Sequence, residues 1–550
     1  MSGTFTTLAN FDATNNSPEG DLVDISGTLY GTGNNGGTSG FGTLFSFSTA
    51  SGTWNVLYNF SGAIGGSTDG AAPTSGLVDV GGTLYGTTFN GGSASSYGTL
   101  FSYDPGSGQE QVLVSFNAND GANPHGAVID VGGILYGTTQ SGGAGTSYGT
   151  LFAYDVATAK LQTLFSFDNT DGATPVGSLI DVSGTLYGTT NYGGTSGDGT
   201  LFAYDLAAGT LETLANFNGT NGHSPYGGVI DVNGTLYGTT ISGGTADAGT
   251  LFAYNIAAGT LDALASFTGP SGGGPAAGLL DVNGTLYGTT INDGTAGDGS
   301  LFAYNIAGNS LQTLVTFNGN NGSVPIGGLI DINGTLYGTT SSGGSATDGT
   351  LFSYTLACFA EGTEILTECG EVPVEDLAVG VRVATLSGRL ARIAWLGHRT
   401  VEPQRHPRPY DVNPIRVHAD AFGKNLPAGD LILSPDHAVL VDGSLIPIRH
   451  LANGTSIAQE PRTRITYWHV ELDRHDAILA EGLACETYLD TGNRDAFAGE
   501  AATRLHPDFA QNHAARIWAE RGCAPILTEP AAPALRHLHT GLLAKAARAA

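Results

Sequence analysis

Asn233-Gly-Thr-Leu-Tyr-Gly-Thr-Thr240 is one copy of a stretch that recurs throughout residues 1–357. Its core, Gly-Thr-Leu-Tyr-Gly-Thr or a close variant, appears seven times at intervals of 50 to 55 residues. The tyrosines that mark the copies are Tyr30, Tyr85, Tyr136, Tyr187, Tyr237, Tyr287 and Tyr337. A fixed period of this length indicates a repeat architecture, in which each unit buries its apolar face against its neighbours.

Each unit predicts four short strands. Ser178–Val182 is a first strand, and a pair such as Asn233-Gly234 turns the chain into a second strand, because both turn positions favour positive φ. A Gly-rich loop then leads to a third strand, as at Gly249–Tyr254, and a short turn leads to a fourth, as at Thr210–Phe217. The pattern resembles Kelch-type and bacterial GloVer tandem repeats, and it predicts the four-stranded blades of a β-propeller in an all-β protein.

The two ends of the repeat region complement each other. Gly3–Asp12 matches the fourth strand Gly209–Asn218, and Gly349–Ala357 matches the third strand Gly249–Ala257. The N-terminal strand can therefore complete the last blade. We expect a closed seven-bladed ring, which would remove the exposed edges of an open array.

Alternating strand direction predicts that the short turns lie on one face and the long loops on the other. The long loops are rich in Asn, Asp, Gly and Ser, as at Phe167–Gly172 and Phe217–Gly222. We expect a glycan or protein ligand on this long-loop face, because adaptable loops on a rigid scaffold are common binding surfaces. Calcium is an alternative for these oxygen-rich loops, but Asx turns explain the composition, and we expect no cofactor and no metal site.

Other residues of the repeat region receive structural interpretations. Seven equivalent aspartates are expected to accept turn N–H groups: Asp24, Asp79, Asp130, Asp181, Asp231, Asp281 and Asp331. His125, His223 and Lys160 break the repeat, and we interpret them as isolated exceptions without acid or nucleophile partners. The repeats therefore predict no catalytic constellation.

Charge limits the partners. The chain carries a net charge of −29, and residues 1–357 contain 25 acidic residues against one basic residue, a net −24. Such acidity disfavours nucleic acid and anionic membranes. No run of 18 apolar residues predicts a membrane span. We expect a monomer that is secreted or on the cell surface, without a recognisable N-terminal signal peptide.

The composition changes at Cys358, where Arg, His and Pro become frequent. Alternating runs predict a second all-β domain over residues 358–499, with strands at Val372–Leu377, Arg382–Thr385, Leu431–Leu433, Ala438–Val441, Leu445–Ile448 and Ile465–Leu472. We expect residues 500–550 to form a tail with a helix-like stretch. All four cysteines follow the repeats, and Cys369, Cys485 and Cys523 are expected to be small buried hydrophobes.

Three blocks of this second domain resemble Hint (hedgehog/intein) domains of the bacterial free-standing type: Cys358–Thr367 followed by Val374–Leu377, Leu433–Leu440, and Tyr467–Gly482. The resemblance implies self-cleavage. Cys358 would attack the carbonyl of Ala357 and exchange the amide for a thioester. It also assigns two residue roles: His437 would protonate the departing nitrogen, and Ser434 would hydrogen-bond around the strained bond. We add His469 and His475 as candidates for assisting the second step.

Splicing is not expected. Inteins end in His-Asn, whose amide nitrogen cyclises, whereas the matching end here is Ala484-Cys485-Glu486-Thr487. A glutamate has no amide nitrogen for that reaction, so the domain would be a single-turnover autoprotease that gives pieces of 357 and 193 residues. Two alternatives stay open: a binding or adhesion propeller with an inert Hint domain, and a propeller lyase or hydrolase.

Overall fold

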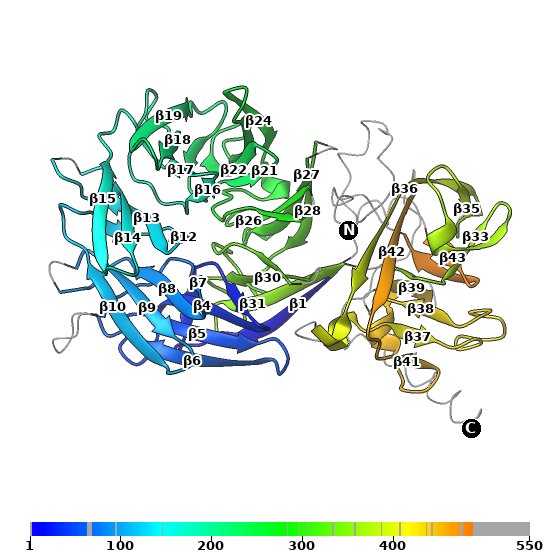
Figure 1. Ribbon diagram of the computed structural model, residues 1–550. Coiled ribbons are helices and arrows are strands. Elements are labelled where there is room, and N and C mark those ends of the chain that lie inside the picture. Colours follow the sequence, from blue (N-terminus) through cyan, green and yellow to red (C-terminus); the bar gives the residue numbers. More distant parts are fainter. Residues whose placement is uncertain are drawn as a thin grey trace.

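The computed structural model describes residues 3–487 apart from 63–68, 94–95, 146, 283, 295, 307–308, 333–334, 357–358, 387, 406–408, 436, 442–443 and 473–476. Its strands form seven small antiparallel sheets and one large sheet. Figure 1 shows the small sheets around a common centre, with the large sheet of the second domain to one side. No described helix is long and apolar enough to cross a membrane.

Each small sheet has four strands in chain order, except that the last sheet takes its fourth strand from the start of the chain. The first strands are β3 (Val23–Ile25), β7 (Val78–Val80), β12 (Ile129–Val131), β16 (Ile180–Val182), β21 (Ile230–Val232), β25 (Leu280–Val282) and β29 (Ile330–Ile332). The second strands are β4 (Thr28–Asn35), β8 (Thr83–Thr88), β13 (Ile134–Ser141), β17 (Thr185–Thr190), β22 (Thr235–Ser242), β26 (Thr285–Thr290) and β30 (Thr335–Thr340).

The outer half of each sheet follows the same plan. The third strands are β5 (Thr43–Ser48), β9 (Thr99–Asp104), β14 (Thr150–Asp155), β18 (Thr200–Asp205), β23 (Thr250–Asn255), β27 (Ser300–Asn305) and β31 (Thr350–Leu356). The fourth strands are β6 (Thr53–Asn59), β10 (Gln109–Ser115), β15 (Lys160–Ser166), β19 (Thr210–Asn216), β24 (Thr260–Ser266), β28 (Ser310–Thr316) and β1 (Gly3–Asn10). Three sheets gain a short fifth strand, namely β2 (Asn16–Pro18), β11 (Ala122–Pro124) and β20 (His223–Pro225). A 3₁₀ turn, η2 (Gly269–Ser271), lies between two sheets.

The repeated glycine of the second strand has a packing reason. The phenylalanine of the third strand lies over it, so a Cβ built on Gly238 would come within 2.5 Å of the Phe252 ring. The hairpin turns also follow the sequence prediction, since Asn233 and Gly234 have φ values of 54° and 81°. Six of the seven turn aspartates accept the N–H three residues on, as Asp231 does from Gly234 at 2.9 Å. The structural interpretation of these aspartates is confirmed at those six positions.

Apolar clusters join consecutive sheets. One contains Tyr187 of β17 and Phe252 of β23, from the fourth and fifth sheets. Another contains Phe45 of β5 and Tyr337 of β30, from the first and last sheets. The N-terminal strand β1 pairs with β31 over Gly3–Asn10, which is the pairing that the sequence predicts. The first and last sheets therefore share a buried cluster in the same way as neighbours along the chain.

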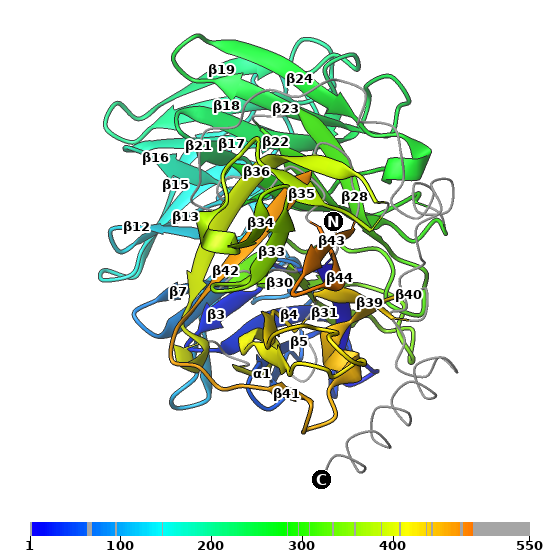
Figure 2. The ribbon, with the colours of Figure 1, turned by 90° about the vertical axis from the view of Figure 1, so that its right-hand side faces the viewer.

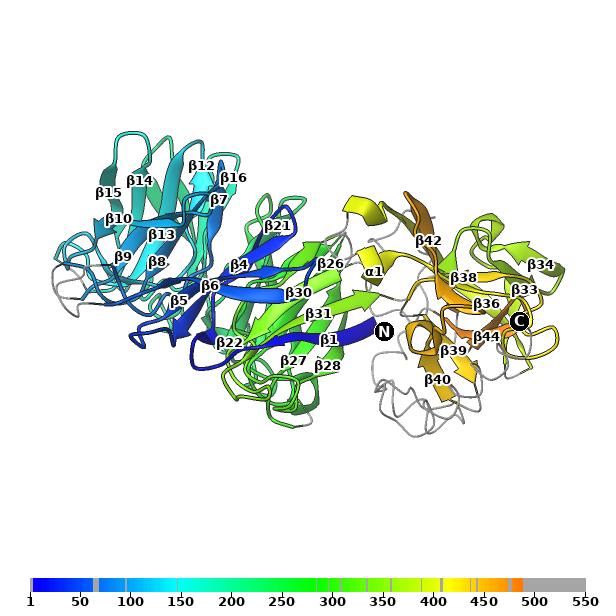
Figure 3. The same ribbon diagram turned by 90° about the horizontal axis from the view of Figure 1, so that it is seen from below.

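The second domain forms one sheet of 13 strands. Its strands are β32 (Phe359–Ala360), β33 (Glu364–Thr367), β34 (Gly370–Pro373), β35 (Arg382–Ala384), β36 (Leu390–Val401), β37 (Ile415–Val417), β38 (Leu431–Leu433), β39 (Ala438–Val441), β40 (Ser444–Pro447), β41 (Ile457–Gln459), β42 (Ile465–Leu472), β43 (Ala477–Ala480) and β44 (Leu483–Glu486). Its short helical turns are η3 (Val374–Asp376), η4 (Pro403–Arg405), α1 (Pro409–Val412) and η5 (Ile448–Leu451). Figure 2 looks onto this domain, where the long strands β36 and β42 run side by side, and Figure 3 shows it beside the repeat sheets.

One predicted strand of this domain is wrong. The sequence predicts a strand over Val372–Leu377, but β34 ends at Pro373 and the 3₁₀ turn η3 follows. Proline lacks an N–H and cannot continue a strand ladder. The strands expected at Leu431–Leu433, Ala438–Val441 and Ile465–Leu472 are confirmed with the same bounds.

Candidate functional site

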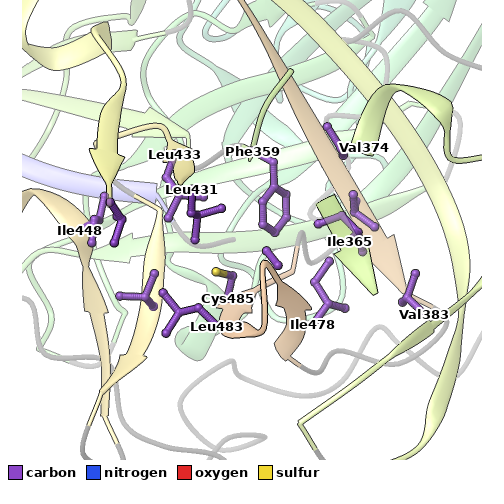
Figure 4. Close-up of a cluster of buried hydrophobic side chains, with 14 of the residues drawn as sticks. Phe359, Ile365, Val374, Val383, Leu431, Leu433, Ile448, Ile478, Leu483 and Cys485 are labelled. Carbon is purple, nitrogen blue, oxygen red and sulfur yellow. The ribbon is translucent and has the colours of Figure 1, made fainter. Parts of the chain in front are cut away.

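Strand β32 lies between two partners that come from distant parts of the second domain. Phe359 pairs with Leu433 of β38 on one side and with Trp468 of β42 on the other, and Ala360 pairs with Tyr467. Both pairings are antiparallel. Figure 4 shows the Phe359 ring among the buried side chains of the domain core. These contacts fix the chain immediately after the predicted scissile bond.

Two predicted site residues occupy the turn between β38 and β39. Ser434 follows β38 directly, and its carbonyl accepts the His437 N–H at 3.0 Å. The carbonyl of His437 in turn accepts the Ile448 N–H at 2.9 Å. Ser434 is 4% exposed and His437 is 2% exposed. The turn therefore holds both polar side chains inside the domain.

The imidazole of His437 lies against the first residue of β32 that the structure describes. The ring centroids of His437 and Phe359 are 4.1 Å apart, with an angle of 55° between their planes. The sequence does not predict this contact. A signal was present, because Phe359 directly follows the predicted nucleophile, but the partner of its ring depends on long-range packing.

The third predicted residue, His469, lies on β42. It is 2% exposed and stands opposite Gly397 of β36. Its neighbour Trp468 pairs with Phe359 and stacks on His398, with ring centroids 4.4 Å apart. The structure thus brings Ser434, His437 and His469 to the two strands that flank β32.

The remaining site residues, Ala357, Cys358 and His475, lie outside the described residues, as does Cys523. Their roles stay predictions.

The other two cysteines differ from each other. Cys485 is fully buried in the core, and burial raises the pKa of its thiol, as expected of a small buried hydrophobe. Cys369 is exposed, so the expectation that it is buried is wrong.

The repeat-breaking residues are not isolated, which corrects the sequence interpretation. The Tyr226 hydroxyl and Nε2 of His125 are 2.9 Å apart. His223 lies 3.7 Å from a carboxylate oxygen of Asp198. The sequence does not reveal these partners, because each pair joins residues of different repeat units.

The exposed Lys160 has a partner as well. It stands opposite Asp155 in the ladder between β14 and β15. Its charge helps to lower the pKa of Asp155, although hydrogen bonds from Thr158 contribute more. This pair lies on the surface and indicates no catalytic role.

Side chains of the oxygen-rich loops accept hydrogen bonds from backbone N–H groups of the same loops. Oδ1 of Asp171 accepts the Asp168 N–H at 3.0 Å, and Oδ1 of Asp168 accepts the Thr170 N–H at 2.9 Å. These bonds form the expected Asx turns. Within the described ranges, no group of three or more His, Cys, Asp or Glu side chains is placed to hold a metal ion.

Comparisons with known families match both halves of the chain. The Hint domain family matches residues 357–492. The Gloeobacter/Verrucomicrobia repeat family matches residues 63–231 and 208–368. No curated protein matches the sequence.

Three solved structures resemble the fold at low identity. The extracellular domain of a putative hybrid two-component system from B. thetaiotaomicron is 13% identical with a TM-score of 0.42, and the match covers 70% of this chain and 51% of that one. TolB from Acinetobacter baumannii is 13% identical with a TM-score of 0.35, covering 54% and 65%. An oligogalacturonate lyase in complex with manganese is 11% identical with a TM-score of 0.39, covering 65% and 97%.

Proposed function

Because the chain belongs to the Gloeobacter/Verrucomicrobia repeat family and carries a Hint domain, we propose that the Hint domain cuts the Ala357–Cys358 bond and releases the repeat region. The observation that carries this proposal is the register around β32. Phe359 pairs with Leu433 and with Trp468 in antiparallel fashion. Ser434 and His469 directly follow these two partners of Phe359, so both lie on segments that flank the start of β32.

The first step is an acyl shift within the chain. The Cys358 thiolate attacks the carbonyl carbon of Ala357, a C–S bond forms and the amide C–N bond breaks. The departing α-amino nitrogen takes a proton from His437, since imidazole exchanges protons near neutral pH. Ser434 hydrogen-bonds around the reacting amide. The buried positions of both side chains support these roles, because a water-poor site strengthens hydrogen bonds to developing charge.

The second step is hydrolysis. Water attacks the thioester carbonyl with assistance from His469, the C–S bond breaks, and the thiol of Cys358 is regenerated. One water is consumed overall, leaving a carboxylate at Ala357 and a free amine at Cys358. The chain does not splice, because Glu486 stands where an intein has the asparagine that cyclises.

The released repeat region is a closed seven-bladed propeller in this proposal. Two contacts support closure: β1 pairs with β31, and Phe45 and Tyr337 share one buried cluster between the first and last sheets. In a closed ring no strand edge is left exposed where the two ends of the repeat region meet. This suits a fragment that must stay folded after its release. Deletion of residues 3–10 should therefore lower the melting temperature of the whole repeat region.

The test is the intact mass of purified wild-type protein beside Cys358→Ala, each with and without dithiothreitol. The wild type should yield a fragment of residues 1–357, and Cys358→Ala should stay whole. Cys369→Ala is the matched control, because it removes an exposed thiol elsewhere in the domain and should cut normally. An uncut wild type under every condition would contradict the proposal.

A second candidate function is binding of a glycan or protein by the long-loop face, with or without cleavage. Two tyrosines in long loops support it, since Tyr148 is 42% exposed and Tyr192 is 51% exposed. Exposed aromatic side chains are common anchors in binding surfaces. Screening the full chain against glycans and surface proteins, with a Tyr148→Ala/Tyr192→Ala double variant as comparison, tests this role.

A further inference from the structure

One position of the repeat has a different residue in every unit although the residue before it is always the same. It directly follows a proline that all seven units share and precedes the first strand. Its occupants are Glu19, Thr74, His125, Val176, Tyr226, Ala276 and Ile326. The repeat therefore fixes the backbone here but leaves the side chain free to vary, as expected of a position with a function specific to this protein.

The seven positions lie around the common centre of the sheets. In five units the next residue is a glycine that lies close to the equivalent segment of the following unit, so a Cβ built on Gly177 would lie 2.8 Å from the Gly227 carbonyl oxygen. A Cβ on Gly327 would likewise lie 2.9 Å from the carbonyl oxygen of Gly20. Figure 1 shows the first strands, which follow these segments, on the inner side of the sheets. Because each position ends a loop between units, the circle opens on the long-loop face. We call it the central mouth.

Three of the seven positions carry titratable side chains, namely Glu19, His125 and Tyr226. Tyr226 and His125, from the fifth and third units, are joined by the 2.9 Å contact between their polar atoms, and their rings meet edge to face at 5.2 Å. The contact spans the segment of the fourth unit. Glu19 of the first unit accepts a hydrogen bond from Asn34 at 2.9 Å. Burial raises the pKa of Tyr226 to about 12, and the nearby charge of Glu19 contributes.

We propose that Glu19, His125 and Tyr226 bind an alkylammonium group at the central mouth. The proposal is independent of self-cleavage. A half-buried carboxylate favours a cation, because an opposite charge replaces part of the hydration that burial removes. Burial indeed raises the pKa of Glu19, against the effect of its bond from Asn34. The faces of aromatic rings such as Tyr226 attract ammonium groups.

Two further observations favour a cation over an anion or a neutral group. The repeat region has a net charge of −24, which concentrates cations near its surface. His125 is held neutral near pH 7, because burial lowers the pKa of its imidazole. It therefore adds no positive charge that would repel the ligand.

The second domain joins at the opposite end of the sheets. Strand β31 runs from Thr350, next to a long loop, to Leu356, at the short-turn face, and the Hint domain follows. Ligand binding at the central mouth should therefore be the same in the uncut Cys358→Ala chain and the wild type. Failure of one proposal leaves the other intact.

The test is calorimetric titration of full-length Cys358→Ala with n-butylammonium, beside n-butanol as the neutral isostere. The ammonium should bind one to one, and butanol should bind at least about tenfold more weakly. Nα-acetyl-lysinamide and spermidine then distinguish a peptide side chain from a free polyamine by which of them binds more tightly. Absence of ammonium binding, or equal binding of butanol, would overturn the proposal.

Variants locate the site. Glu19→Gln should weaken ammonium binding by about tenfold or more, and Tyr226→Phe by roughly three- to tenfold. The matched controls are Glu212→Gln and Tyr410→Phe, which change exposed side chains and should leave binding unaltered. Melting temperatures establish that each variant is folded. Equal losses in Glu19→Gln and Glu212→Gln would show a diffuse charge effect and would contradict a site at the central mouth.

Discussion

Residues 1–356 repeat one unit seven times, whereas residues 359–487 fold once, and this difference decides how a functional residue is recognised in each region. In the repeats, a residue present in every unit is structural, such as Asp231 at its turn or Gly238 beneath Phe252. The candidates for a functional role are residues that differ from the other units, such as His125 and Tyr226. The second domain has no repeated unit with which a residue can be compared. A candidate residue there is recognised from its motif and from the side chains that pack beside it.

The largest expected effect concerns the second domain. His437→Ala should slow cleavage of the full chain by about 10²- to 10⁴-fold, because it removes the proton donor for the departing nitrogen. The time course of fragment formation on a gel measures this rate. His418→Ala is the control, since the exposed His418 lies 3.2 Å from a carboxylate oxygen of Asp430 and should not affect cleavage. Equal rates in wild type and His437→Ala would remove this residue from the mechanism.

A residue shared by all units should matter to stability instead. Gly238→Ala should cost roughly 1–3 kcal/mol of folding free energy, since its Cβ would come within 2.5 Å of the Phe252 ring. Gly269→Ala is the comparison, because no atom lies within 4 Å of the Cβ it would gain. Denaturant unfolding of the repeat region measures both. Similar losses in the two variants would show that the crowding beneath Phe252 is not the cause.

An exception inside the sheets should give a pH-dependent effect. Glu110 stands opposite Tyr103 of β9, where the other units carry an apolar residue. Burial raises the pKa of Glu110 to about 7, the charge of Asp69 adds to this, and the hydrogen bond from Tyr58 opposes it. The folded state holds this proton more tightly than the unfolded chain does. The contribution of the proton to folding stability is therefore complete below pH 4.5 and is lost as the pH rises through 7.

Glu110→Gln carries no titrating proton at this position. The variant should therefore gain about 1–2 kcal/mol over wild type at pH 8 and much less at pH 5. Denaturation midpoints at the two pH values measure the difference, with the exposed Glu212→Gln as control. A gain that is the same at both pH values would contradict the titration of Glu110.

The smallest effect is expected at Ser434. Removing one neutral hydrogen bond near the reacting amide should slow cleavage by roughly three- to tenfold in Ser434→Ala. Ser444→Ala, on β40 of the same domain, is the control for loss of a hydroxyl. Fragment formation is timed as for His437→Ala. A loss in Ser434→Ala as large as that in His437→Ala would give the serine a greater part than a supporting hydrogen bond.

Local chemistry explains which features were predictable. Asn233-Gly234 specifies its turn because these two residue types favour the positive φ values that the turn requires. The strand bounds in the repeats are predictable because the same sequence pattern occurs seven times. The pairing of β32 with β38 and β42 joins segments far apart in the chain, so no local pattern reveals it. The contact of His437 with Phe359 depends on that pairing and was missed for the same reason.

The central mouth was missed for a different reason. His125 and Tyr226 are 101 residues apart, and neither belongs to a motif. The sequence alone shows that both occupy the same position of the repeat, just before a first strand. What the sequence does not show is the distance between these two side chains across the common centre of the sheets, and this distance determines whether residues of units three and five can meet.

The most direct test of the central claim, an acyl group carried on Cys358, is cleavage in the presence of hydroxylamine followed by intact mass. The account predicts a fragment of residues 1–357 whose Ala357 bears a hydroxamate, because hydroxylamine takes the acyl group from the thioester. Cys358→Ala should give no fragment. A fragment that appears in Cys358→Ala, or one that ends at another residue, would contradict the account.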